Sequence, residues 1–279
     1  MQPIKLFVGS GEASVIERKV FIYSVLKHTK RPVDIYVFNG THNSIEKNNE
    51  PPTLAPMPLH IKYKNVTEFS NYRWYIPQIC GFEGKAIFAD SDMICLDDIG
   101  NFFDLDLSDY DLLAKGNAYK SGDDQAIWGL SLCLFDCSKA RFDVEKIFSE
   151  IDQGLYTLTD LHQMKPAFLK VHPYKIGEIS AGWNDFDFCN DNTKLIHYTN
   201  LYTQPWKAKG HPHADLWFQY LDEAIEQQFV TSDDIEKAML RSYARRDILE
   251  RDRISTGIVK KIGKKNATKQ LIKEFLPGK

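Results

Sequence analysis

The acidic segment Asp90-Ser91-Asp92 constrains this chain more than any other stretch, because it separates two apolar runs. Residues 86–89 before it are typical of a buried strand, and a second apolar run over residues 93–96 follows at once. Side chains two positions apart in a strand point to the same face, so Asp90 and Asp92 can reach one object. Carboxylates beside buried strands are costly unless a cation or donors compensate them. The segment therefore predicts a hard divalent metal at a strand end.

The spacing by itself does not decide the matter. The same Asp-x-Asp pattern recurs at Asp104/Asp106, Asp109/Asp111 and Asp185/Asp187, in polar, loop-like surroundings. Only the Asp90/Asp92 copy has apolar runs on both sides. From spacing and flanks alone, a metal site and a strand end that happens to be acidic are equally compatible with the sequence.

Composition excludes several classes of protein. With 279 residues and 43% hydrophobic content, the chain can build one large α/β domain or two small ones. A net charge of −3 gives no global electrostatic case for nucleic-acid binding. No apolar run approaches the roughly 18 residues that span a bilayer, and the N-terminus has no signal-peptide layout. Five cysteines without a Cys-x-x-Cys pair favour a reduced, cytoplasmic setting.

The first elements predict a β-α-β unit. Residues 4–8 indicate a strand that closes at Gly9-Ser10-Gly11, residues 13–28 a helix with a broad apolar face, and residues 33–38 a second strand. Such units have parallel strands and bind ligands at the carboxyl ends of these strands. The glycines do not form a Gly-x-Gly-x-x-Gly fingerprint, so a dinucleotide-binding fold is not predicted.

The later chain predicts a mixed α/β fold with a helical C-terminal part. The expected strands are residues 59–63, 111–114, 127–135 and 194–198, and the expected helices are residues 69–82, 138–151, 215–228 and 232–245. Residues 158–164 are expected to form a short helix or a loop. Residues 41–58 predict a long loop. We expect a catalytic domain over residues 1–207, a helical extension over 208–256 and a tail over 257–279.

The tail differs in charge from the rest of the chain. Residues 257–279 hold seven lysines and one glutamate, a net of 7 − 1 = +6, with apolar residues interleaved. This pattern suits a peripheral contact with the inner face of a membrane or an anionic partner, and it equally suits a solvated terminus.

The candidate third metal ligand is His197, which lies near the end of a predicted strand as Asp90 does. Carboxylates with one imidazole suit Mn²⁺ or Mg²⁺ better than structural zinc. Such ions usually complete their coordination with phosphate oxygens, so a nucleotide diphosphate or a phosphoester is the expected ligand.

Three motifs in order make the sequence recognisable. Residues 69–77 read FSNYRWYIP, residues 86–99 read AIFADSDMICLDDI, and residues 195–206 read LIHYTNLYTQPW. Together they resemble glycosyltransferases of family eight, which includes glycogenin and bacterial lipopolysaccharide galactosyltransferases, over roughly residues 4–207. The order of three separated motifs is more specific than any one of them.

The resemblance implies a GT-A fold, with a mixed, mostly parallel central sheet flanked by helices. It also implies a nucleotide-sugar donor, usually a UDP-sugar, with Mn²⁺ and retention at the anomeric carbon. It places Asp90, Asp92 and His197 on the metal, and Arg73 near the nucleotide. Val8, Gly9, Ser10 and Ser91 would contact the nucleotide-sugar, and Lys207 would neutralise the diphosphate. Asp160 and Gln163 lie in the part of the chain expected to face the sugar, where residues 123–125 and 185–187 compete for the role.

Departures from the family pattern leave other functions open. Gly129-Leu130-Ser131 replaces the usual Asn-Ser-Gly, Gln204 stands where a lysine is usual, and Asn200 replaces a glycine. One alternative is a haloacid-dehalogenase-type phosphatase, which also places Asp-x-Asp after a strand, although Ile94 stands where that class has Thr or Val. The other is a nucleotide-sugar-binding protein without turnover. The sugar and the acceptor are not determined by these motifs.

Overall fold

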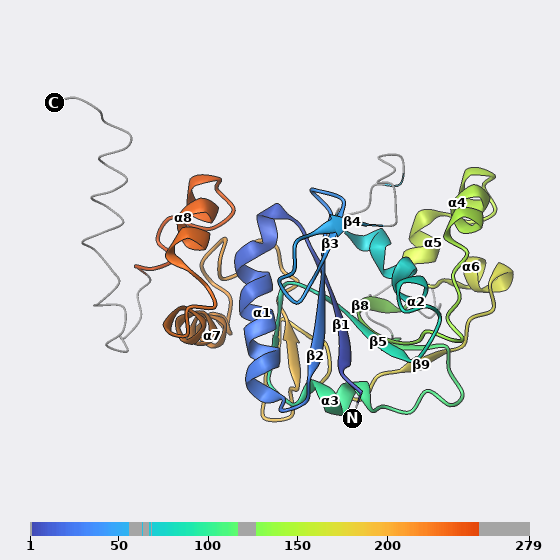
Figure 1. Cartoon of the computed structure of the whole chain (residues 1–279), viewed down its shortest axis with the longest axis horizontal. Coiled ribbons are helices and arrows are strands. Elements are labelled where there is room, and N and C mark those ends of the chain that lie inside the picture. Colours follow the sequence, from blue (N-terminus) through green and yellow to red (C-terminus); the bar gives the residue numbers. More distant parts are fainter. Residues whose placement is uncertain (1, 56–62, 64–66, 68, 117–126, 251–279) are drawn as a thin grey trace.

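The core of the protein is an eight-stranded sheet, accompanied by a smaller three-stranded sheet (Figure 1). The computed structural model describes residues 2–55, 63, 67, 69–116 and 127–250. The large sheet has the strand order β4-β3-β2-β1-β5-β8-β7-β9, and the small one the order β10-β11-β6. The chain passes from the large sheet to the small one between β5 and β6, which is where Asp90 and Asp92 lie.

The strands described in the two sheets range from two residues in β4 and β10 to eight in β8. They are β1 (Ile4–Ser10), β2 (Val33–Asn39), β3 (Ser44–Lys47), β4 (Thr53–Leu54), β5 (Lys85–Asp90), β6 (Met93–Cys95), β7 (Leu112–Lys115), β8 (Gly129–Asp136), β9 (Ile176–Glu178), β10 (Asp185–Phe186) and β11 (Leu195–His197).

Eight α-helices and two 3₁₀ helices are found in the described part of the chain. They are η1 (Glu12–Ser14), α1 (Val15–His28), η3 (Ser70–Tyr75), α2 (Ile76–Ile79), α3 (Ile99–Phe103), α4 (Val144–Asp152), α5 (Leu158–His162), α6 (Pro166–Val171), α7 (Ala214–Glu226) and α8 (Ser232–Leu240). None of the helices in these described residues is long and apolar enough to cross a membrane.

The sheet is mixed, as the sequence predicts. Strand β1 pairs in parallel with β2 and with β5, which confirms the β-α-β unit. Pairs β2–β3, β3–β4, β5–β8 and β7–β8 are antiparallel, so the sheet is less parallel than expected. The central strands β1 and β5 are buried on both faces, which explains their near-continuous apolar sequence.

Helices cover both faces of the large sheet. Phe7 and Phe88 point into a cluster with η3, α4, α5 and α6, whereas Leu6 and Ile87 point into a cluster with α1 and α3. This alternation is the two-residue period of a strand. Helix α1 has two buried sides, since Phe21 contacts the sheet cluster and Val20 belongs to a third cluster with α7 and α8. In Figure 1, α1 accordingly lies between the sheet and the C-terminal helices.

Several predicted elements are wrong in their bounds. The loop expected over residues 41–58 contains strands β3 and β4, and asparagines Asn43, Asn48 and Asn49 take positive φ at their turns. The helix expected over residues 69–82 is a 3₁₀ helix followed by the short α2. Helix α4 begins only at Val144, because Asp136 first accepts hydrogen bonds from Ser138 in a turn and Asp143 then caps the helix.

Some predictions fall on residues outside the described part of the chain. These are the basic tail over residues 257–279, the acidic segment 123–125 and, apart from Tyr63, the strand expected over residues 59–63. They stay predictions.

Candidate metal centre

The two aspartates lie where the chain leaves the large sheet. Asp90 ends β5, and β6 begins at Met93. Strand β5 is parallel to β1, so Asp90 lies beside Gly9 at the carboxyl ends of both strands. This edge of a parallel pair is where open α/β sheets bind ligands. Ser91, which is 3% exposed, fills the turn between the aspartates.

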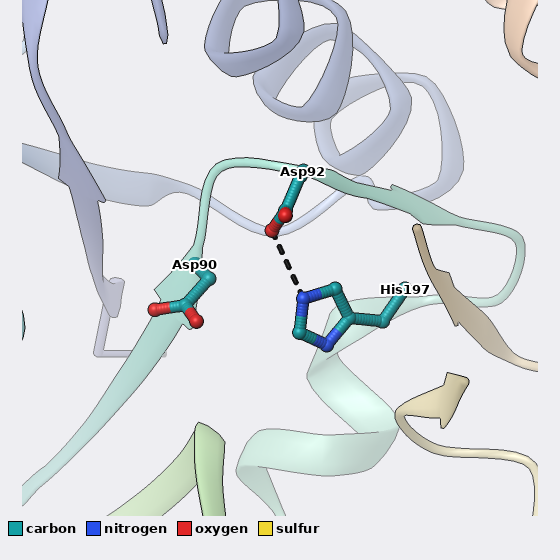
Figure 2. A group of neighbouring side chains, drawn as sticks. All are labelled: Asp90, Asp92 and His197. Atoms are coloured by element: carbon teal, nitrogen blue, oxygen red, sulfur yellow. Dashed lines mark ion pairs between the residues drawn. The ribbon is translucent and has the colours of Figure 1, made fainter. Parts of the chain in front are cut away.

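His197 comes to the same place from a distant part of the sequence. It ends β11, which pairs antiparallel with β6 so that His197 lies opposite Met93. One ligand atom from each of Asp90, Asp92 and His197 lies within 4.8 Å of the others. Figure 2 shows the three side chains turned toward a common point. The structure therefore brings together the three residues that the sequence assigns to the metal.

A buried amide orients the imidazole. His197 Nδ1 lies 3.0 Å from the Oδ1 atom of Asn184, and Asn184 Nδ2 donates to Ser131 Oγ at 3.0 Å. A carbonyl oxygen at Nδ1 favours the proton on that nitrogen, which leaves Nε2 as the metal-binding atom. Nε2 lies 3.0 Å from Asp92 Oδ1. Burial opposes a charge on His197, but the charge and hydrogen bond of Asp92 together with the charges of Asp90 and Asp187 outweigh it and raise the pKa of the imidazole.

Asp90 lies in a less polar environment. Burial raises the pKa of its carboxyl to about 6; the charge of Arg73 opposes this shift, and that of Asp92 adds to it. The Arg73 Nη2 atom is 3.8 Å from Asp90 Oδ1, which is buried and accepts no hydrogen bond within the described residues. Two carboxylates, one imidazole and an unsatisfied buried oxygen fit a hard divalent cation such as Mn²⁺ or Mg²⁺.

Arg73 ties this site to the surrounding sheet. Its guanidinium donates to the carbonyls of Leu130, at 2.6 Å, and Ser70, at 2.9 Å, and its charge lies 4.5 Å from the centre of the Phe88 ring. With all of these contacts the side chain is only 7% exposed. It therefore fixes η3 against β5 and β8, next to the predicted metal.

Sequence reasoning assigned no role to Gln204. Its Nε2 atom donates to Asp92 Oδ2 at 3.1 Å and to the Tyr198 carbonyl at 2.9 Å. The residue is 1% exposed, and its Oε1 atom is buried without a hydrogen-bond partner within the described residues. The signal for this role in the sequence is a glutamine, rather than a lysine, directly before Pro205-Trp206.

Glu17 was also missed. This carboxyl lies in the first turn of α1, is 3% exposed, and senses the charges of both Lys207 and Asp92. Burial raises its pKa to about 7, which the attraction of Lys207 partly opposes. A glutamate between the apolar residues Ile16 and Val20 was the signal for a buried acid.

The predicted nucleotide contacts lie at the end of β1. The Val8 side chain belongs to the core cluster below the sheet, so only its backbone is available to a ligand. Ser10 Oγ accepts a hydrogen bond from Arg18 Nη1 at 3.1 Å. Gly9 has no room for a side chain, because a Cβ atom there would lie 2.4 Å from the Phe69 ring. Lys207 is exposed and follows Gln204 in a tight turn, with its amide 2.8 Å from the Gln204 carbonyl.

Helix α5 lies on the Arg73 side of the site. His162 Nε2 is 2.7 Å from Asn71 Oδ1, and the carbonyl of Gln163 accepts from the amide of Trp128 at 3.1 Å. Burial and the charge of Arg73 lower the pKa of His162 to about 3. The Asp160 carboxylate caps its own helix by accepting from Thr157, whereas the Gln163 side chain has no hydrogen-bond partner within the described residues.

The competing acidic segment 185–187 lies beside His197. Strand β10 pairs with β11, and the Asp187 amide donates to the His197 carbonyl at 2.9 Å. The Asp187 carboxylate already accepts from Thr199, lies 3.0 Å from His211 Nε2 and accepts from the Asn200 amide at 3.2 Å. These contacts give Asp187 a role in holding the loop after β11.

Comparisons with other proteins support the fold. No protein-family profile matches the chain. Protein CDI of Arabidopsis thaliana is 24% identical to it over 246 residues, which cover 80% of this chain and 87% of that protein. The galactosyltransferase LgtC, solved with donor and acceptor sugar analogs, superimposes with a TM-score of 0.60 at 15% identity, covering 84% of this chain and 100% of LgtC. The fold is the GT-A fold.

A second solved glycosyltransferase has the same GT-A core. The bifunctional WbbM superimposes with a TM-score of 0.57 at 16% identity, covering 81% of this chain and 51% of WbbM, so the chain spans about half of that protein. Another structure of LgtC carries an active-site glutamine-to-glutamate substitution. At these identities the likeness shows the fold, and activity has to be argued from the site.

Proposed function

We propose that this protein is a metal-dependent glycosyltransferase that moves a hexose from a UDP-sugar to a hydroxyl of a glycan or lipid-linked acceptor, with retention. The observation that carries the proposal is the cluster of Asp90, Asp92 and His197 at the carboxyl end of a central strand in a GT-A fold. The neighbouring folds belong to proteins named as glycosyltransferases, one of them solved with sugar analogs.

The chain's own residues would prepare the site for the donor. Asp90, Asp92 and His197 would hold Mn²⁺ or Mg²⁺, which supplies positive charge against a diphosphate leaving group. Asn184 keeps the His197 Nε2 atom available, and Gln204 holds the second oxygen of Asp92. These contacts fix the ligand atoms before the donor arrives, which lowers the cost of ordering them.

The nucleotide would lie across the end of β1. The backbone of Val8, Gly9 and Ser10 is adjacent to Asp90 through the β1–β5 pairing, so a ligand there can reach the metal. The absence of a side chain at Gly9 lets Phe69 pack closely at this point. Ser91 would contact the donor through its backbone, and Lys207 would neutralise charge on the diphosphate as it leaves.

The residue facing the sugar is proposed to be Gln163 rather than Asp160. Asp160 lies on α5 and Gln163 follows directly after it, next to His162, which senses the charge of Arg73. The Asp160 carboxylate is occupied by its capping contacts. In the galactosyltransferase LgtC a glutamine is described as an active-site residue. A neutral amide can orient the acceptor or the sugar, and it is a poor nucleophile. We therefore favour front-face attack, in which the acceptor hydroxyl approaches the anomeric carbon from the side of the leaving group and is guided by it. This mechanism needs no covalent sugar–protein intermediate.

The test is release of UDP. The protein is incubated with Mn²⁺ and a panel of UDP-sugars, and slow Mn²⁺-dependent hydrolysis of one donor is expected. Asp92→Ala should reduce this rate and the Mn²⁺ affinity by at least about 100-fold, because loss of an outer partner alone commonly costs 10–100-fold. Asp109→Ala, in an exposed copy of the same spacing, is the matched control and should behave as wild type.

Other outcomes separate the alternatives. Unchanged Mn²⁺ and UDP binding in Asp92→Ala would refute the proposed role of the metal centre. Release of phosphate from simple phosphoesters would instead indicate a phosphatase. Tight binding of a UDP-sugar without any turnover would indicate a binding protein, an option that the unusual Gln204 keeps open.

A further inference from the structure

A basic pocket is lined in part by Lys207, and none of the proposed metal ligands Asp90, Asp92 and His197 lines it. Its volume is about 370 Å³, and its wall is formed by the Lys207 loop on one side and the segment after α8 on the other. The polar lining residues are Lys207, Ser242, Tyr243, Arg245 and Arg246.

Two hydrogen bonds from Arg245 to backbone carbonyls hold the two walls together. The Arg245 amide donates to the Trp206 carbonyl at 2.7 Å, and Arg245 Nη1 donates to the Ala208 carbonyl at 3.2 Å. Ser242 has a positive φ of 60° at the end of α8, which turns the chain back toward Lys207. The pocket is thus a built feature of the fold.

The charges around the pocket are not balanced. Arg245 Nε pairs with Asp247 at 2.8 Å, and Lys209 shares the same carboxylate at 3.2 Å. Within the described residues, neither Lys207 nor Arg246 has a carboxylate within 4.0 Å. The buried acid that senses Lys207 is Glu17, whose pKa is raised by burial to about 7, so it is only partly charged at neutral pH.

The pocket begins close to the metal centre. The Lys207 amide donates to the Gln204 carbonyl at 2.8 Å, and the Gln204 side chain donates to Asp92 Oδ2 at 3.1 Å. A ligand in the pocket can therefore have one end near the metal. Two cations without a carboxylate within 4.0 Å among the described residues, together with two hydroxyls, match the oxygens of a phosphate group.

We propose that this pocket binds a phosphate group, with Lys207 and Arg246 as its charge partners and Ser242 and Tyr243 as neutral donors. The phosphate belongs either to the diphosphate of the donor or to a phosphorylated acceptor. Only the choice between these sources rests on the function proposed above. Arg246 is thereby assigned a ligand-binding role that the sequence motifs do not give it.

The test uses inorganic pyrophosphate and the full-length protein in EDTA, with calorimetry as the readout. Without a metal the triad is acidic and repels pyrophosphate, so binding reports on the basic pocket. Arg246→Gln and Lys207→Gln should each weaken binding about tenfold, the usual effect of losing one charge-assisted hydrogen bond. Lys237→Gln, on the exposed face of α8 and paired with Asp233, is the matched control and should change nothing. Arg246→Lys should restore part of the affinity.

The result can overturn the proposal in two ways. The first is that pyrophosphate does not bind to the wild-type protein. The second is that Arg246→Gln and Lys207→Gln bind it with wild-type affinity while each keeps the wild-type melting temperature. Asp92→Ala should lose Mn²⁺ affinity but bind metal-free pyrophosphate no more weakly than wild type, because it removes a repelling carboxylate and no residue of the pocket. Failure of the metal-centre proposal and failure of the pocket proposal are therefore distinguishable.

Competition identifies the source of the phosphate. If UDP with Mn²⁺ displaces pyrophosphate and Arg246→Gln weakens UDP binding, the pocket takes the donor diphosphate. If UDP and pyrophosphate bind together, the pocket takes a phosphate of the acceptor. Either result supports the pocket as a phosphate site.

Discussion

At the residue scale, a chain of buried polar contacts determines how the metal ligands are presented. It runs from Ser131 through Asn184 and His197 to Asp92 and Gln204. Asn184 is fully buried, and its positive φ of 62° is one that asparagine tolerates better than most residues. The buried contacts of Asn184 with Ser131 and with His197 hold the imidazole in one orientation.

Replacing Asn184 should therefore weaken metal binding. In Asn184→Gly the positive φ is kept without strain and the amide is lost, so His197 is free to change tautomer. We expect the Mn²⁺ affinity to fall about 10–100-fold, measured by calorimetry on the metal alone. Asn192→Ala, on an exposed loop nearby, should bind as wild type. An affinity within twofold of wild type for Asn184→Gly would contradict the orienting role.

Glu17 should make stability depend on pH. Burial raises the pKa of its carboxyl from 4.5 to about 7 in the folded protein, so between these values the folded state holds more protons than the unfolded state. The contribution of Glu17 to the free energy of unfolding is therefore fully present below about pH 4.5. It is lost as the pH rises toward 7, and the loss is about 3 kcal/mol at most.

The variant that tests this is Glu17→Gln, studied by urea unfolding in EDTA. Relative to wild type it should gain about 1–3 kcal/mol of stability between pH 5 and pH 8, because the buried charge is no longer formed. The charges of Lys207 and Asp92 partly cancel one another at this position. If the free energies of unfolding of the two proteins differed by the same amount at pH 5 and at pH 8, the pKa of Glu17 would not be shifted in the folded protein.

At the element scale, strand ends position the site more than helices do. Gly9 at the end of β1, Asp90 at the end of β5 and His197 at the end of β11 converge although they are far apart in sequence. The 3₁₀ helix η3 packs beside these strand ends, and Phe69, which directly precedes it, packs against Gly9. Packing at this junction therefore controls both stability and the position of the nucleotide site.

Gly9→Ala tests the junction. A methyl group 2.4 Å from the Phe69 ring must displace it, and overpacking in a well-packed region costs about 1–3 kcal/mol. The double variant with Phe69→Leu should recover part of this loss, which chemical unfolding of the four proteins of the cycle can measure. Strictly additive effects of the two substitutions would show that the two residues do not interfere.

At the scale of the whole molecule, the C-terminal helices belong to the same hydrophobic cluster as the start of α1. Trp217 of α7 lies 5.2 Å from Trp206, ring centre to ring centre, and both are almost fully buried. Ion pairs join α1 to the same helices, Lys19 to Asp234 at 2.6 Å and Lys27 to Glu223 at 2.6 Å. Helices α7 and α8 therefore support the loop that carries Gln204 and Lys207.

Trp217→Ala should destabilise the entire protein. Loss of a fully buried tryptophan typically costs about 3–5 kcal/mol, and we expect one cooperative urea transition shifted by that amount. Trp217→Phe should cost distinctly less because it keeps most of the volume. A separate low-denaturant transition with the rest of the protein intact would instead show that the C-terminal helices unfold independently.

The sequence alone determined the local elements and the chemistry of the metal ligands. Apolar runs defined β1, β2 and β5, and the acidic pair at the end of β5 together with His197 indicated a metal before any contact was known. Such features are local, because the period of a strand, its ends and the chemistry of a ligand side chain depend only on residues close together in the sequence. Asp160 shows the limit, since its capping box with Thr157 is also local and had not been recognised.

Only the tertiary structure decided which residues support that metal site. Gln204 reaches Asp92 across 112 positions, Arg73 reaches Leu130 across 57, and Glu17 becomes a buried acid because α7 and α8 cover α1. The pairing of β6 with β11, which brings His197 to Asp92, is likewise a contact between distant strands. Sequence patterns indicate which side chains are buried, but the partner of a buried polar group depends on strand pairing and helix packing, which no local pattern encodes.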